Sequence, residues 1–270
     1  FASNSQSIVT TCEDATIMQW DLKGNKIQNF KGHAQVITSL CFSPDGNSIV
    51  TACADNTARF WDIINNKYLH LKGHQSKVTS VACSLDGNSI LTGSEDKTAK
   101  IWDRSGKVLH TFKLSGKVTS VAFSPDGKMV LTGCFDGCTK VWETSGKEVI
   151  MLKQVEKITN AAFSPDGKMI ATASVEGIIR MFDLTGKNIK SISVMSQINS
   201  MVYSSDGKTI ITGAFNGLTK VWDAKTGDAI LEILGRIYGA GDIFPQTQFD
   251  GLVAEFGRQS ATLRGNLILK

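Results

Sequence analysis

A pair made of a large aromatic residue and an acid recurs six times in this chain at a nearly constant spacing. The pairs are Trp20-Asp21, Trp61-Asp62, Trp102-Asp103, Trp142-Glu143, Phe182-Asp183 and Trp222-Asp223, and the steps between them are 41, 41, 40, 40 and 40 residues. A fixed period in this range is the signature of a repeat architecture, in which each unit is one supersecondary structure that stacks on its neighbours. This spacing constrains the fold more than any other feature of the sequence.

Each unit consists of four short β-type runs separated by turn residues. In the second unit the first two runs are separated by Ser43-Pro44-Asp45-Gly46, whose proline, aspartate and glycine suit a tight turn. None of the runs is long enough to predict a helix. Four antiparallel strands per unit predict one propeller blade, and a blade buries both of its faces only by stacking on other blades.

Two further motifs, Gly32-His33 and Gly73-His74, precede the second and third units. Together with the Ser-Pro-Asp-Gly turns and the repeated Trp-Asp, they resemble the motifs of the WD40-repeat family, the β-propellers that include the β subunit of heterotrimeric G proteins. The resemblance covers roughly residues 1–235. It implies an all-β fold, a β-propeller of four-stranded antiparallel blades.

The resemblance also implies that a His, a Ser or Thr, an Asp and a Trp form a buried hydrogen-bonded set within a blade. By position, these sets are His33, Thr51, Asp55 and Trp61 in the second unit, and His74, Thr92, Asp96 and Trp102 in the third. The later units depart from this pattern, with Leu114, Gln154 and Val194 at the histidine position and with Glu176 and Phe182 for the Asp and Trp of the fifth unit. We expect those blades to depend less on the polar set and more on packing.

Both ends of the chain depart from the repeat. Phe1 aligns with Phe42, so the first blade lacks most of its inner strand, and we interpret the chain as a segment of a longer polypeptide. After residue 235 the signature stops, although Phe249-Asp250-Gly251 can be aligned with the turn of the second unit. Seven repeats of about 40 residues would account for the length of 270 residues with the missing strand added. We predict a single domain over 1–270, a seven-bladed ring in which 236–270 form a degenerate seventh repeat; six blades with a capping tail are the alternative.

Composition narrows the class of protein. The net charge is +4, which is mild, and the sequence has no apolar run of 18 residues, so we expect no membrane span. Of the six cysteines, Cys12, Cys53 and Cys134 share one repeat position, and no Cys-x-x-Cys pair or Cys/His spacing indicates zinc. We therefore interpret the cysteines as reduced and predict an intracellular protein, either cytoplasmic or nuclear.

The sequence offers no constellation for catalysis. Two of the four histidines, His33 and His74, belong to the structural sets, and His70 and His110 fall on outer strands, where we expect partly exposed edge residues. The sequence has no glycine-rich loop that would cradle a phosphate. We expect a protein that is not an enzyme and that needs no metal or cofactor.

In WD40 relatives, partners commonly use the face formed by the loop that enters each inner strand and by the residue before the turn acid. The residues at these positions that we select are Val36, Lys77, Lys117, Lys157 and Gln197 at strand entry, and Phe135, Val175 and Phe215 before the turn acid. We call this set the Lys/Phe face. Aromatic residues beside charge are typical of interaction hot spots. The alternative is that the lysines were copied with the repeat and that Glu95 neutralises Lys77.

These observations favour a non-catalytic scaffold or recognition module that binds a protein or peptide on the Lys/Phe face, within a larger complex or a multidomain chain. One alternative is a nucleic-acid-binding propeller that uses the same lysines. The low net charge and the lack of an aromatic ladder count against it. A further alternative, by analogy alone, is the sensor domain of a larger signalling ATPase.

Overall fold

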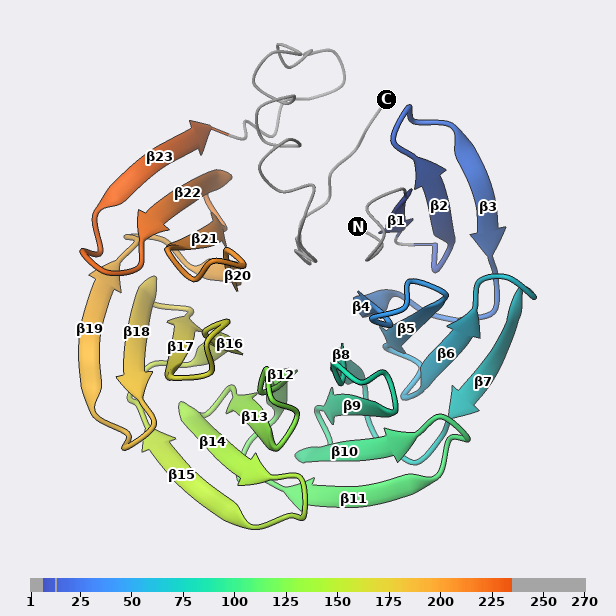
Figure 1. Cartoon of the computed structure of the whole chain (residues 1–270), viewed down its shortest axis with the longest axis horizontal. Coiled ribbons are helices and arrows are strands. Elements are labelled where there is room, and N and C mark those ends of the chain that lie inside the picture. Colours follow the sequence, from blue (N-terminus) through green and yellow to red (C-terminus); the bar gives the residue numbers. More distant parts are fainter. Residues whose placement is uncertain (1–6, 13, 235–270) are drawn as a thin grey trace.

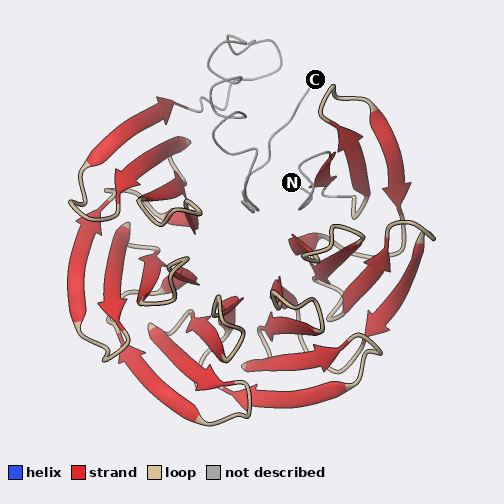
Figure 2. Ribbon diagram, in the orientation of Figure 1, coloured by secondary structure: helices blue, strands red, loops and turns tan. Residues whose placement is uncertain are grey.

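The computed structural model of the chain describes residues 7–12 and 14–234. Within these residues every regular element is a β-strand, and loops and turns connect the strands (Figure 2). The strands form six sheets that stand side by side around a common axis (Figure 1). We number these sheets as blades one to six in chain order.

The strand boundaries follow the predicted runs closely. The first blade contains β1 (Ser7–Thr11), β2 (Ile17–Asp21) and β3 (Lys26–Phe30). The second contains β4 (Ile37–Phe42), β5 (Ser48–Cys53), β6 (Ala58–Asp62) and β7 (Lys67–Leu71). The third contains β8 (Val78–Cys83), β9 (Ser89–Ser94), β10 (Thr98–Asp103) and β11 (Val108–Lys113). The fourth contains β12 (Val118–Phe123), β13 (Met129–Cys134), β14 (Cys138–Glu143) and β15 (Glu148–Lys153). The fifth contains β16 (Ile158–Phe163), β17 (Met169–Ser174), β18 (Ile178–Asp183) and β19 (Asn188–Ser193), and the sixth contains β20 (Ile198–Tyr203), β21 (Thr209–Ala214), β22 (Leu218–Asp223) and β23 (Ala229–Leu234).

Within each blade consecutive strands pair antiparallel, so the order is that of a simple meander, as in β4-β5-β6-β7. The first strand of a four-stranded blade lies nearest the axis and the last strand lies at the rim (Figure 1). All turns between first and second strands, and between third and fourth strands, therefore lie at one end of the blades. The loops between blades and the turns between second and third strands lie at the other end.

The hydrophobic core lies between the blades. All six residues of β5 are buried, because neighbouring blades cover both of its faces, whereas the outer strand β7 is buried mainly at its last residue. One cluster joins Ile17 and Phe30 of the first blade to Ile49 and Trp61 of the second, and similar clusters follow at the later interfaces. Stacking of blades thus supplies the burial that one blade lacks.

The Ser-x-Asp-Gly sequences form tight turns between the first and second strands. In the second blade the Gly46 N–H donates to the Ser43 carbonyl at 2.9 Å, and the Ser43 hydroxyl donates to Asp45 Oδ1 at 2.5 Å. Gly46 has a φ of 72°, in the left-handed region that glycine adopts at least cost. The turn residues are therefore explained by backbone conformation and local hydrogen bonds.

The part of the chain that the structure describes has six blades, not the seven that we predicted. The predicted seventh repeat, 236–270, lies outside the described residues. The count of seven extended the forty-residue period into a segment without its signature, since Leu263-Arg264-Gly265 aligns with Phe60-Trp61-Asp62. Length alone does not specify a blade that lacks the residues from which the others are built.

Candidate functional site

The residues of the Lys/Phe face lie in the loops at one end of the blades, and the same backbone hydrogen bond joins them in pairs. In each of blades two to six, the residue before the turn acid donates its N–H to the carbonyl of the strand-entry residue. These bonds are Ala54 to Val36 at 3.0 Å, Glu95 to Lys77 at 2.9 Å, Phe135 to Lys117 at 2.9 Å, Val175 to Lys157 at 2.9 Å and Phe215 to Gln197 at 2.8 Å. The sheet therefore holds the two kinds of loop at a fixed separation in every blade.

Two side-chain contacts link the loops of neighbouring blades. Lys117 Nζ lies 2.7 Å from Glu95 Oε2, and Lys157 Nζ lies 5.3 Å from the centre of the Phe135 ring. The alternative interpretation paired Glu95 with Lys77, but the Glu95 carboxylate pairs with Lys117 of the next blade. Because the Lys117 side chain is 58% exposed, this pair contributes at most about 1 kcal/mol to stability.

Large apolar side chains are exposed among these loops. Phe215 is 72% exposed, Val36 47% and Phe135 42%. Two further residues of the interblade loops, Val155 at 99% and Met195 at 91%, are almost fully exposed. Val175 is half-buried. The loops of blades four to six thus present four large apolar side chains at the end of the blades that carries Lys117 and Lys157.

Val155 and Met195 were missed by the sequence analysis, although a signal for them exists. Both stand directly after the position that holds His33 and His74 in the second and third units, where the next residues are Ala34 and Gln75. In the fifth and sixth units both the histidine and the residue after it are replaced. Comparing this position between units would have added both residues to the Lys/Phe face.

The proposed structural sets form hydrogen-bonded chains inside the second and third blades. In the second blade His33 Nδ1 lies 3.0 Å from Asp55 Oδ2, His33 Nε2 lies 2.8 Å from the Thr51 hydroxyl, and the Trp61 indole N–H donates to that hydroxyl at 2.8 Å. The corresponding distances in the third blade, among His74, Asp96, Thr92 and Trp102, are 2.8, 2.7 and 2.8 Å.

Burial and hydrogen bonding shift the pKa values of these groups in opposite senses. Burial lowers the pKa of His33 and of His74, so both imidazoles are favoured in the neutral form. Burial tends to raise the pKa of Asp55, but hydrogen bonds from Thr57 and His33 outweigh it and hold that pKa well below its usual range. The same balance lowers the pKa of Asp96. A neutral imidazole that donates to an ionised carboxylate fits both sets.

The remaining blades keep part of this hydrogen-bonded set. The indole N–H of Trp20, Trp142 and Trp222 donates to Thr10, Thr132 and Thr212 at 2.8, 3.0 and 2.9 Å. In the fifth blade, where Phe182 has no donor, the Thr172 hydroxyl instead donates to Gln154 Oε1 at 3.0 Å. Leu114 packs against the hydrophobic cluster of its interface, and Val194 is buried.

One group of potential metal ligands occurs in the described residues, formed by His33, Cys53 and Asp55 with donor atoms within 4.8 Å of one another. Its donors already have partners. His33 contacts Asp55 and Thr51, and the Cys53 thiol donates to the Gln35 carbonyl at 3.0 Å. The group is therefore explained by the internal hydrogen-bonded set, and the arrangement does not indicate a metal centre.

Comparison with known families identifies the fold independently. The family model described as the IFT122 first β-propeller matches residues 36–234. The chain therefore belongs to this family of WD40-type β-propellers, as the repeat and its motifs predicted. Propellers of this type are generally non-catalytic, and membership suggests a role in protein interaction within a complex.

A search of curated proteins found no match to this chain. In residues 7–12 and 14–234, no helix has the length and apolar character needed to cross a membrane.

Proposed function

We propose that this protein is a non-catalytic interaction scaffold that binds a protein or peptide segment through the Lys/Phe face, extended by Val155 and Met195. The observation that carries the proposal is the exposure of Phe215, Val155 and Met195 in loops at one end of the blades. Exposed apolar groups on loops held by a rigid scaffold are typical of binding surfaces.

The charges of these loops favour a partner that carries both apolar and acidic side chains. Lys157 lies beside the ring of Phe135, and Lys77 has no carboxylate partner within ion-pair distance among the described residues. A partner segment that inserts apolar side chains between these loops and places a carboxylate near Lys157 or Lys77 would satisfy both features. Polar side chains around an apolar centre are the usual arrangement of a protein interface.

Nucleic acid is the second candidate class for the same lysines. Against it, Lys117 is already paired with Glu95, which lowers the positive charge of the loops. The exposed apolar groups include the aliphatic Val155 and Met195, which offer no flat ring for a base to stack on.

The sensor-domain alternative, the single domain over 1–270 and the intracellular location stay predictions.

Affinity purification from the source cells tests the proposal. The wild-type protein is compared with a Phe135→Ala/Phe215→Ala variant and with a control, Ile64→Ala/Val149→Ala, which removes exposed apolar groups from a turn at the opposite end of the blades and from the outer strand β15. We expect the first variant to lose at least one protein that the control retains.

The proposal would be wrong if both variants retained the same proteins as the wild type. Binding that survives nuclease treatment and tolerates salt would support a protein partner. Binding that is lost with nuclease and falls steeply with salt would instead assign the face to nucleic acid.

A further inference from the structure

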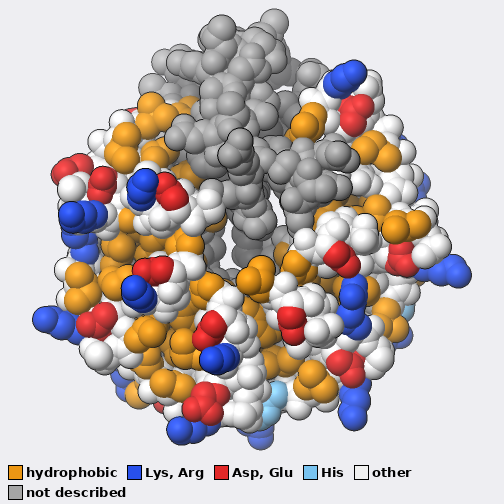
Figure 3. All heavy atoms as spheres, in the orientation of Figure 1, with side chains coloured by type: hydrophobic (Ala, Val, Ile, Leu, Met, Phe, Trp, Pro, Cys, Tyr) orange, Lys and Arg blue, Asp and Glu red, His pale blue; other side chains and the backbone are white. Residues whose placement is uncertain are grey.

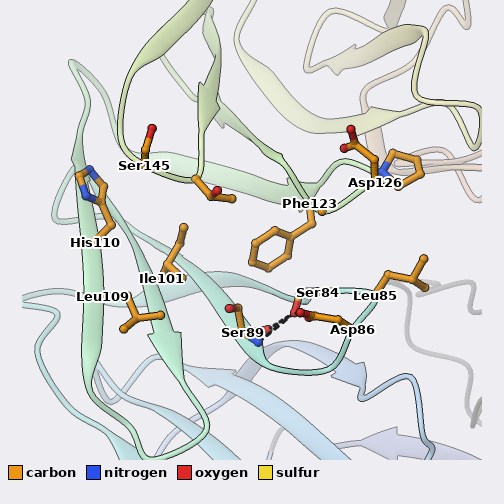
Figure 4. Close-up of a pocket in the computed structure, with 13 residues that line it drawn as sticks. Ser84, Leu85, Asp86, Ser89, Ile101, Leu109, His110, Phe123, Asp126 and Ser145 are labelled. Atoms are coloured by element: carbon orange, nitrogen blue, oxygen red, sulfur yellow. Dashed lines mark hydrogen bonds between the residues drawn. The ribbon is translucent and has the colours of Figure 1, made fainter.

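A cavity of about 700 Å³ lies between the third and fourth blades, at the end of the blades opposite the Lys/Phe face. Its walls come from the first turns of both blades, from β11 and from the last turn of the fourth blade (Figure 4). The ring of Phe123 points into this space, and Asp86 and Asp126 lie on the two turns that flank it (Figure 4). Acidic, basic and hydrophobic side chains are interspersed on the face of the molecule that Figure 3 shows.

The neighbouring interface, between the second and third blades, offers a comparison. Arg104, in the last turn of the third blade, extends across it. Its guanidinium lies 3.6 Å from Asp45 Oδ2 in the first turn of the second blade, and 5.4 Å from the centre of the Phe60 ring. An arginine side chain from within the chain therefore lies across this interface, near an acid and an aromatic ring, and its side chain is 45% exposed.

The repeat gives the corresponding residues one blade later. Moving forward by 41 residues takes Asp45 to Asp86 and Phe60 to Ile101, and moving forward by 40 takes Arg104 to Thr144. An acid and an apolar residue are thus kept as Asp86 and Ile101, but the side chain of Thr144 is too short to reach from its own blade to Asp86. The cavity thus lies where a counterpart of Arg104 would extend, and Asp86 lacks the guanidinium that Asp45 has.

The lining suits a long cationic side chain. Asp86 and Asp126 are its acidic residues, and hydrogen bonds from the Ser84 and Ser124 hydroxyls, at 2.5 and 2.6 Å, lower the pKa of both carboxyls and favour their charged forms. Leu85, 69% exposed, and Leu109, 52% exposed, offer apolar surface for the methylene stem of an arginine.

We propose that this cavity is a docking site for an arginine side chain of a protein partner, which would reach Asp86 as Arg104 reaches Asp45 at the neighbouring interface. The site is separate from the Lys/Phe face, so it stands or falls independently of the proposed function.

Methyl-detected NMR of the whole chain tests the proposal, with the blocked peptide acetyl-Gly-Arg-Gly-amide as the probe. We expect saturable shifts of the Leu85, Ile101 and Leu109 methyl signals. The same peptide with citrulline in place of arginine keeps the shape of the side chain but has no charge, and it should bind at least about tenfold more weakly.

Three variants sharpen the test. Thr144→Arg should fill the cavity from within the chain and abolish the shifts, whereas Ala224→Arg, at the corresponding position of the sixth blade, should leave them unchanged. Arg104→Thr should leave Asp45 and Phe60 free for the peptide and create a second set of shifts, near Phe60 and Leu69. Methyl signals distant from the substituted turn report whether each variant is folded.

Three results would overturn the assignment. The first is the absence of shifts with the arginine peptide at high concentration. The second is equal binding of the citrulline peptide, and the third is unaltered binding by the folded Thr144→Arg variant.

Discussion

At the residue scale, a threonine hydroxyl is the central member of each complete hydrogen-bonded set. The Asp96 carboxylate accepts from His74 Nδ1, which leaves Nε2 as an acceptor for the Thr92 hydroxyl at 2.7 Å. That hydroxyl in turn accepts from the Trp102 indole at 2.8 Å. One hydroxyl therefore satisfies two buried groups, and no water needs to enter the blade.

We predict that Thr92→Val lowers the free energy of unfolding by about 2–4 kcal/mol, because it leaves the His74 Nε2 and the Trp102 N–H buried without partners. The matched control is Thr172→Val in the fifth blade, where the hydroxyl serves only the half-buried Gln154 side chain and we expect a loss of about 1 kcal/mol. Urea denaturation measures both. Equal losses at the two positions would contradict this account.

The buried histidines also predict a pH dependence. Burial lowers the pKa of His33 and His74 in the folded state, so below the ordinary value of about 6.5 the unfolded chain binds more protons than the folded one. The free energy of unfolding should therefore be highest above that value and fall as the pH decreases from 7 to 5. The slope is at most about 1.4 kcal/mol per pH unit for each histidine.

His33→Gln/His74→Gln provides the comparison, since Gln154 shows that a blade accommodates glutamine at this position. We expect the variant to be less stable at pH 8 but to lose less stability between pH 7 and 5. Chemical denaturation at several pH values measures this difference. A slope as steep as that of the wild type would assign the pH dependence to other groups.

At the scale of the elements, neighbouring first strands pack a small residue against a large one. Ala122 and Phe163 share one interface cluster, and Ala162 and Tyr203 share the next. At the interface of the second and third blades the corresponding residues are Cys41 and Cys83, whose sulfur atoms lie 3.3 Å apart. Two side chains of equal size thus stand here in place of a small and a large one.

This exchange predicts strong coupling between the two positions. Cys83→Phe alone should overpack the interface and destabilise the fold by about 1–3 kcal/mol, and Cys41→Ala alone should leave a small cavity. The double variant recreates the pair of the other interfaces, so its loss should be smaller than the sum of the two by about 1 kcal/mol or more. Additive losses in a double-mutant cycle would show that the two residues do not share one packing site.

At the scale of the whole molecule, the repeat made the fold predictable. The Trp-Asp spacing and the Ser-x-Asp-Gly turns predict the boundaries of strands such as β5 and β9 closely, because each blade repeats the same alternation of buried runs and turns. The number of blades was less predictable. Beyond residue 235 the residues that specify a blade are missing, and length carries little information by itself.

Contacts between blades were the least predictable part of the candidate site. The alternative interpretation of the lysines paired Glu95 with Lys77 of its own blade, yet Glu95 pairs with Lys117, because a long side chain reaches the next blade as easily as its own. Repeat alignment shows which positions are equivalent, but it does not show which way a flexible side chain turns. The cavity beside Thr144 likewise follows from a comparison of two interfaces, which no single unit reveals.

The central claim is that the Lys/Phe face binds a protein partner, and photo-crosslinking in the source cells tests it most directly. The photoreactive analogue benzoyl-phenylalanine replaces Phe215 in one variant, Phe135 in a second and the exposed Ile64, in a turn at the opposite end, in a third. We predict adducts with the same protein at Phe215 and Phe135, resistant to nuclease, and none with that protein at Ile64. Adducts with nucleic acid, or a protein adduct at Ile64 alone, would contradict the account.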